Sequence, residues 1–93
     1  MEQHDEFFES LMELGAGALV VLHRGDEYWC SLEDVDLGGP GYMLSLVGVG
    51  DSIAKARENY YERVKKLLSS EYVLVAGKKF RCINTNEWIW TQV

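Results

Sequence analysis

The chain has few of the cysteines and histidines that build disulfide scaffolds and metal sites, and it has no apolar run of the length that builds a membrane span. Its two cysteines, Cys30 and Cys82, stand far apart, and its two histidines are His4 and His23. This spacing fits neither a zinc site nor a C-x-x-C redox motif, so we expect two reduced, buried cysteines and a cytoplasmic protein. The longest uninterrupted apolar run, Ala18–Leu22, is far too short to cross a bilayer, which argues against a membrane partner.

Patterns typical of catalytic and cofactor sites are also missing. The segment 48–52 (GVGDS) resembles a phosphate loop before a helix, but it lacks the phosphate-binding lysine, and Asp51 is itself an anion. We therefore interpret it as a tight turn and a helix cap. His23 lies in the same predicted hairpin as Cys30 and Ser31, whose side chains alternate to opposite faces of a strand. We expect a protein that is not an enzyme, with no catalytic residue, no metal and no cofactor.

The length of the chain limits it to one folding unit. Its 93 residues are 47% hydrophobic, which is enough for one compact core. The same length excludes a multidomain enzyme or a dinucleotide-binding unit with its own substrate domain. We predict a single domain over residues 1–93.

Periodicity and turn residues predict an α+β fold. The apolar spacing from Ile53 through Ala56, Tyr60 and Val64 to Leu67 marks an amphipathic helix. The predicted elements are a helix over 5–14, a hairpin of strands 18–23 and 27–33, a loop over 34–41, a strand over 42–47, a turn over 48–52, a helix over 52–68, a second hairpin of strands 72–76 and 80–83, and a short final strand over 87–92. The order is α-β-β-β-α followed by a C-terminal β-hairpin, and we expect an antiparallel sheet with the helices packed on one face.

Basic residues are nearly absent from the first half of the chain. Residues 1–51 hold eleven acids and one base, Arg24, whereas residues 52–93 hold four acids and eight bases. The whole chain carries a net charge of −6. An acidic half repels phosphates and attracts basic protein surfaces. The alternative is that the acids are neutralised within the fold and serve solubility.

The candidate partner-binding residues are acids on the first predicted hairpin and the loop after it, together with two tryptophans. They are Asp26, Glu27, Glu33, Asp34, Asp36, Trp88 and Trp90. The acids suit a protein partner with a basic surface, a calcium ion, or a strand edge kept charged against aggregation, but the spacing of an EF-hand is absent. The tryptophans share one strand face and belong either to the core or to a binding hot spot. The sequence leaves open whether two copies of the chain form a homodimer by pairing their hairpin edges.

The first five predicted elements resemble, in their order, the double-stranded-RNA-binding domain. The segment 48–56 (GVGDSIAKA) is also similar to the G-x-G-D-[ST]-x-x-x-A helix start of the HicB antitoxins and related small phage proteins. The resemblance covers residues 16–68. It implies a scaffold for partners, as in an antitoxin or a phage-encoded, anti-CRISPR-like inhibitor that docks on nucleic-acid-handling machinery.

The alternative function that this resemblance implies is RNA binding. It would use the basic face of the helix 52–68, with Lys55, Arg57, Arg63 and Lys66. The RNA-binding family has a lysine cluster where this chain has only Lys55 and the opposing Asp51. This difference disfavours nucleic acid as a partner.

Overall fold

The computed structural model describes residues 3–39, 42–68 and 72–93. The helices are α1 (Gln3–Leu14) and α2 (Ile53–Leu67). The strands of the described residues are β1 (Leu19–Arg24), β2 (Glu27–Leu32), β3 (Val35–Gly39), β4 (Tyr42–Leu44), β5 (Gly48–Gly50), β6 (Tyr72–Val75), β7 (Lys78–Asn84) and β8 (Ile89–Gln92). The predicted α+β class and the two predicted helices are confirmed.

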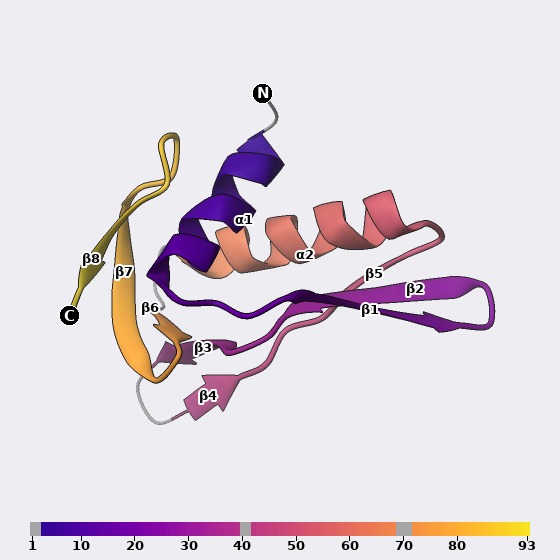
Figure 1. The fold of residues 1–93 in the computed structure, drawn as a ribbon, viewed down its shortest axis with the longest axis horizontal. Helices are drawn as coiled ribbons and strands as arrows, with labels where there is room; N and C mark the ends of the chain where they lie inside the picture. The colour runs from indigo at the N-terminus through magenta and orange to yellow at the C-terminus, as the bar shows by residue number, and fades with distance from the viewer. Residues whose placement is uncertain (1–2, 40–41, 69–71) are drawn as a thin grey trace.

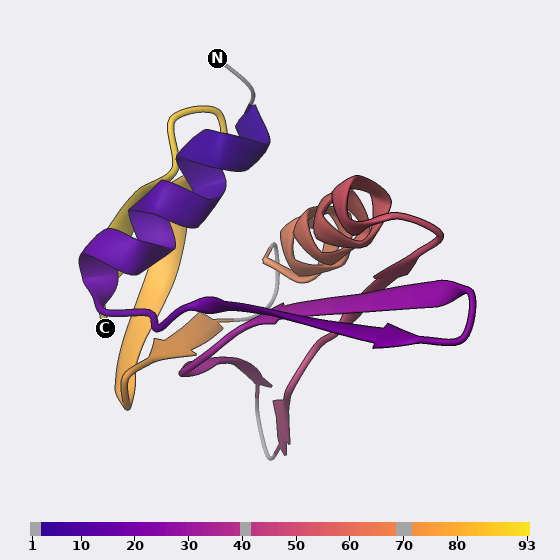
Figure 2. The ribbon, with the colours of Figure 1, turned by 45° about the vertical axis from the view of Figure 1, so that its right-hand side comes forward.

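The strands form two antiparallel sheets rather than the one that we predicted. The first has the strand order β1-β2-β5 and the second has the order β4-β3-β6-β7-β8. Figure 1 shows the β1–β2 hairpin reaching out to one side, while β7 and β8 stand at the opposite end. In Figures 1 and 2, α2 lies along the first sheet and α1 lies beside β7 and β8. The hairpin is therefore an arm that extends from the body of the fold.

Helix α2 begins where the sequence predicts it. The hydroxyl oxygen of Ser52 accepts a hydrogen bond from the backbone N–H of Lys55 at 3.2 Å, which caps the helix. Lys65 and Lys66 occupy the last turn, where positive charge suits the helix dipole. Its buried residues are Ala56, Tyr60, Tyr61 and Val64.

The predicted turn over 48–52 is wrong, because Gly48–Gly50 is strand β5. Its residues pair with Tyr28, Trp29 and Cys30 of β2. The two glycines are needed for close packing against α2: a Cβ at Gly48 would collide with the carbonyl oxygen of Ala56 and the backbone nitrogen of Tyr60. These glycines therefore let a helix pack directly on a strand.

The predicted loop over 34–41 is also wrong for the part that the structure describes. Residues Val35–Gly39 form β3, which pairs with β6, and residues 40 and 41 lie outside the described residues. Val35 and Leu37 point into the core. The predicted strand over 42–47 is strand only in β4, over Tyr42–Leu44. The predicted strand is therefore shortened to β4, and residues 45–47 are not strand.

Aromatic rings fill the core between the helices and the second sheet. Phe7 of α1 meets the rings of Phe8, Tyr61 and Trp88, with centroids 4.9–5.2 Å apart. Trp88 is only 3% exposed and takes a left-handed backbone conformation, with φ of 53°. The turn between β7 and β8 therefore places the indole ring of Trp88 in the core, in contact with Phe7 of α1.

Candidate protein-binding surface

Two of the predicted acids lie at the tip of the β1–β2 hairpin. Gly25 has φ of 60° and opens a two-residue turn, because Arg24 pairs directly with Glu27. Asp26 and Glu27 are exposed on this turn. The two carboxylates thus lie on the turn at the far end of the arm.

Glu33 and Asp34 lie at the corner between β2 and β3. The Oε1 atom of Glu33 accepts a hydrogen bond from the backbone N–H of Ala18 at 3.1 Å. A Cβ placed on Gly17 would lie 2.8 Å from the Cβ of Glu33 and 3.4 Å from Oδ2 of Asp34, so both side chains gather over this glycine. Asp34 itself has φ of 62°, which aspartate tolerates better than most residues. The corner is therefore a close pair of negative charges.

The structure separates the five predicted acids into three places. Glu27 and Glu33 lie at opposite ends of β2, about 20 Å apart at roughly 3.3 Å per residue. Asp36 belongs to β3 in the other sheet, where its Oδ1 accepts a hydrogen bond from the hydroxyl of Ser45 at 2.6 Å. The predicted cluster is thus a tip, a corner and a single carboxylate on β3.

None of these five acids forms an ion pair within the described part of the chain. The ion pairs found there join Lys55 to Asp51 at 3.3 Å and Arg57 to Asp5 at 2.7 Å. A third base, Lys79, lies with its Nζ 4.7 Å from the ring centroid of Tyr72. Within the described residues, no basic side chain therefore pairs with the acids of the tip or the corner.

The two candidate tryptophans have different environments. The expectation that Trp88 lies on a partner surface is wrong, because packing against Phe7 and Tyr61 buries its ring, and the core interpretation is right. Trp90 is half-buried, and its indole nitrogen donates a hydrogen bond to Oγ of Ser10 at 2.9 Å. Trp90 therefore anchors β8 to α1.

Sequence reasoning missed an apolar area on the outer face of the first sheet. Leu22 is 53% exposed and lies directly opposite Trp29 in the neighbouring strand. The guanidinium of Arg24 lies 5.3 Å from the centroid of the Trp29 ring. The indole nitrogen of Trp29 has no hydrogen-bond partner among the described residues. The pairing register of the hairpin was the signal that could have placed Leu22 beside Trp29.

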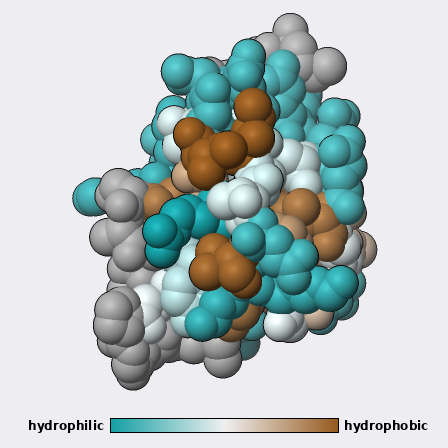
Figure 3. Space-filling view, turned by 90° about the vertical axis from the view of Figure 1, so that its left-hand side faces the viewer, coloured by the Kyte–Doolittle hydropathy of each residue, from teal (hydrophilic) through white to brown (hydrophobic). Residues whose placement is uncertain are grey.

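The opposite end of the molecule exposes further apolar side chains. Ile83 of β7, Ile89 of β8 and the final residue, Val93, are all exposed. Figure 3 looks at this end and shows apolar areas that hydrophilic surface separates. Scattered exposed apolar residues are ordinary on a protein surface, so this face does not mark a binding site.

The basic residues of α2 are largely engaged within the fold. Lys55 pairs with Asp51, and Nη1 of Arg63 donates a hydrogen bond to the carbonyl oxygen of Val47. Arg57 pairs with Asp5 and also lies 4.3 Å from the ring centroid of Phe8. Lys55 and Arg57 are thus paired with acids, whereas the hydrogen bond of Arg63 to a carbonyl leaves its charge in place and Lys66 has no ion-pair partner among the described residues. The acid pairs weaken the RNA-binding alternative only at Lys55 and Arg57.

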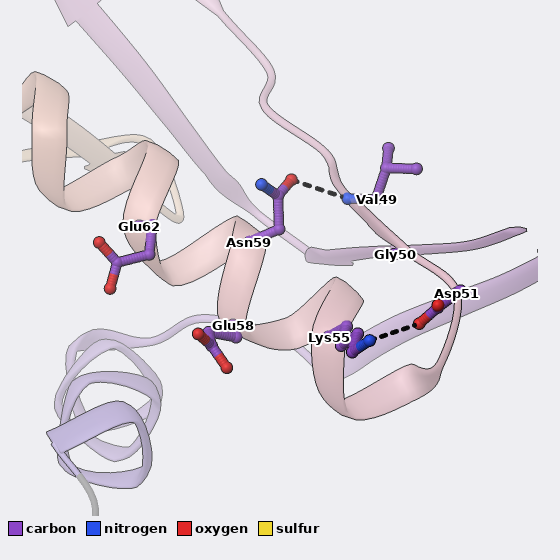
Figure 4. Close-up of a pocket in the computed structure, with 7 residues that line it drawn as sticks. All are labelled: Val49, Gly50, Asp51, Lys55, Glu58, Asn59 and Glu62. Atoms are coloured by element: carbon purple, nitrogen blue, oxygen red, sulfur yellow. Dashed lines mark hydrogen bonds and ion pairs between the residues drawn. The ribbon is translucent and has the colours of Figure 1, made fainter.

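An open groove lies between α2 and β5. Its lining is drawn in Figure 4 and consists of Val49, Gly50, Asp51, Lys55, Glu58, Asn59 and Glu62. Asn59 turns toward the strand and accepts a hydrogen bond from the backbone N–H of Val49 at 2.9 Å, while Glu58 and Glu62 extend outward. The groove therefore carries two exposed carboxylates of its own, on α2.

The two thiols and the buried phenol of Tyr60 are poorly suited to acid–base or nucleophilic chemistry. Burial raises the pKa of the Cys30 thiol and also that of the half-buried Cys82 thiol. Burial likewise raises the pKa of Tyr60 to about 12. In the described residues, Cys30 and Cys82 are free thiols, and no three histidine, cysteine or acidic side chains gather around a metal position. Neither helix, within the described ranges, has the length and apolar character of a membrane span.

Comparison with known proteins does not assign this chain to a family. No family model matches the chain, and no curated protein or solved structure is detectably similar to it.

Proposed function

We propose that this protein is a small non-enzymatic binding module whose acidic arm docks on a basic protein surface. One observation carries the proposal: the tip acids Asp26 and Glu27 and the corner acids Glu33 and Asp34 form no ion pair within the described residues. Unpaired surface charge speeds association with an oppositely charged partner and selects against other partners.

The shape of the arm supports the same function. The β1–β2 ladder runs unbroken from the pair Leu19–Leu32 to the pair Arg24–Glu27, so the acids at its two ends are held at a fixed separation. Two carboxylate pairs held at such a separation complement a basic groove of the kind that binds nucleic-acid phosphates. The partner that we infer is therefore a protein of the nucleic-acid-handling machinery, bound by a cytoplasmic inhibitor of phage origin or by an antitoxin.

The proposal is tested by removing charge while keeping the local structure. The test variant carries Asp26→Asn, Glu27→Gln, Glu33→Gln and Asp34→Asn. Glutamine at position 33 keeps an oxygen for the N–H of Ala18, and asparagine tolerates the left-handed backbone at position 34. A matched control changes the same number of exposed acids outside the arm: Glu6→Gln, Glu9→Gln, Glu13→Gln and Glu62→Gln.

Each protein is immobilised and exposed to a lysate of its source cells after nuclease treatment. We expect the parent and the control to retain one stoichiometric partner at moderate salt, and the test variant to lose it through slower association. Equal retention by the test variant would exclude the arm as the binding surface. Recovery of RNA that nuclease removes would instead favour an RNA-binding function.

A further inference from the structure

Strand β1 forms one edge of the first sheet. It pairs with β2 on one side, and no strand of the described residues pairs with it on the other. Edge strands usually carry lysine, proline or a bulge that prevents pairing with another chain. The sequence of β1 is LVVLHR, which has no lysine and no proline, and its register with β2 is unbroken. Apart from Arg24 at its end, this edge therefore lacks the usual protection.

The register of the hairpin shows which backbone groups face outward. In an antiparallel pair, alternate residues direct their N–H and C=O groups toward the partner strand. The two-residue turn closes on the pair Arg24–Glu27, and at the other end the N–H of Glu33 donates to the carbonyl of Ala18 at 3.1 Å. Counting from either end, the backbone groups that face away from β2 belong to Leu19, Val21 and His23.

These three outward residues are spaced so that they can pair with themselves. If two copies of β1 run antiparallel about a two-fold axis at Val21, Val21 meets Val21 of the second copy, and Leu19 meets His23 of the second copy. Each of these meetings is a hydrogen-bonded pair in the antiparallel pattern. The strand therefore offers six hydrogen bonds to a copy of itself in a single register.

The side chains and charges of β1 fit the same register. Val21 is 37% exposed and Leu22 is 53% exposed, and this pairing would cover both. Arg24 would lie opposite Ala18 of the second copy, whose N–H binds the carboxylate of Glu33. Arg24 and Glu33 project from the same sheet face, and within the described residues neither has an ion-pair partner in its own chain.

We propose that β1 is a homodimer interface that joins two copies of the chain into one six-stranded antiparallel sheet. The occupant is a second copy because the outward hydrogen-bonding groups, the exposed apolar side chains and the Arg24–Glu33 pair all match under one two-fold axis. The same register places Gly25 of one copy opposite Gly17 of the other. The dimer thereby places the tip acids of one copy near the corner acids of the other, a like-charge repulsion that the Arg24–Glu33 pair has to outweigh. The interface does not rest on the proposed function.

The test compares proline at two edge strands. Val21→Pro removes an outward N–H that makes no bond within the hairpin, so the fold should tolerate it. The control is Gln92→Pro on β8, the edge of the other sheet. The N–H of Val93 donates to Lys79, so the neighbouring N–H of Gln92 faces outward. Circular dichroism shows whether both variants are folded.

Sedimentation equilibrium measures the mass of each protein over a range of concentrations. We expect the parent and Gln92→Pro to move from 10.6 kDa toward twice that mass, and Val21→Pro to dimerise at least about tenfold more weakly. A parent that stays monomeric at high concentration overturns the proposal. So does a Val21→Pro variant that dimerises as well as the parent, or a Gln92→Pro variant that does not.

Amide hydrogen exchange in the parent shows whether β1 pairs with a second copy even if Val21→Pro fails to fold. The amides of Leu19, Val21 and His23 should be protected only at high protein concentration. The amides of Val20 and Leu22, which bond to β2, should be protected at every concentration. Protection of the outward amides that does not change with concentration would overturn the proposal. The acid-neutralised variant used above is not needed here, so failure of either proposal can be recognised separately.

Discussion

The indole nitrogen of Trp90 donates a hydrogen bond to the hydroxyl oxygen of Ser10 across 2.9 Å, which ties the last strand to the first helix. The Ser10 hydroxyl in turn donates to the carbonyl oxygen of Phe7 at 2.7 Å, so its oxygen is held in place as an acceptor. The two residues are 80 positions apart in the chain. The free energy that this hydrogen bond contributes to folding therefore reflects how strongly β8 is held against α1.

We expect Ser10→Ala to lower the free energy of unfolding by about 1–2 kcal/mol, because it leaves the half-buried indole N–H of Trp90 without its acceptor. Urea denaturation followed by circular dichroism measures the loss. In a Trp90→Phe background the same change should cost clearly less, since the donor is already gone. An equal cost in both backgrounds would show that the hydrogen bond contributes nothing to stability.

The elements that the sequence predicted well are those with a local signal. The stripe from Ile53 to Leu67, with Asp51 or Ser52 as its cap, identifies α2 without reference to the rest of the fold, and the structure shows that Ser52 is the cap. The hairpin of β1 and β2 follows from two apolar runs around Gly25. Both were found because their evidence lies within one short segment.

The elements that the sequence predicted wrongly contain glycines that serve long-range packing. A Cβ at Gly38 would lie 2.8 Å from the ring of Tyr72, in the strand that pairs with β3. Gly48 has a similar role beneath α2. Composition marks such segments as turns, and only the distant partner shows that they are strands. Composition also identified the acids of the candidate surface. It could not show that β2 holds Glu27 and Glu33 at its opposite ends, so that they do not form one cluster.

Gly48→Ala should destabilise the protein by about 3 kcal/mol or more, because the new methyl group meets backbone atoms of Ala56 and Tyr60 that cannot move aside without shifting α2. Thermal unfolding measures the effect. Gly77→Asn is the control: its position is open within 4 Å, and asparagine tolerates a positive φ. A Gly48→Ala protein that melts with the parent would mean that α2 and β5 are farther apart than the structure places them.

Stability should fall in alkaline solution through the buried phenol of Tyr60. Burial raises its pKa from 10.0 to about 12, opposed by its hydrogen bond with the backbone of Leu32. The folded state therefore keeps a proton that the unfolded state has lost. The stabilisation is complete below pH 10 and is lost as the pH rises through about 12.

Urea denaturation at a series of pH values above 9 measures this dependence for the parent and for Tyr60→Phe. The variant is less stable near neutral pH because it lacks the hydroxyl, but its stability should fall less steeply between pH 10 and 12. Parallel curves for the two proteins would assign the alkaline loss to other groups.

The thiol of Cys30 should react with an aromatic disulfide reagent only when the protein unfolds. Its side chain is buried beneath α2 and its pKa is raised by that burial, so little thiolate is present or accessible at pH 8. A Cys82→Ser variant isolates this thiol, and its rate of modification should rise with urea in step with the loss of helical signal. Rapid modification of Cys30 without urea would contradict the burial.

The turn between β6 and β7 offers a stabilising change. Ala76 has φ of 51° and Gly77 has φ of 82°, and both lie between the paired residues Val75 and Lys78. Two positive φ values in a two-residue hairpin favour Asn-Gly. Alanine pays a steric cost in this conformation that asparagine largely avoids, so Ala76→Asn should raise the free energy of unfolding by about 0.5–1 kcal/mol. Urea denaturation compares it with Ala76→Val, whose branched side chain should lower stability at the same position. A gain from valine and a loss from asparagine would mean that the turn does not adopt the left-handed conformation.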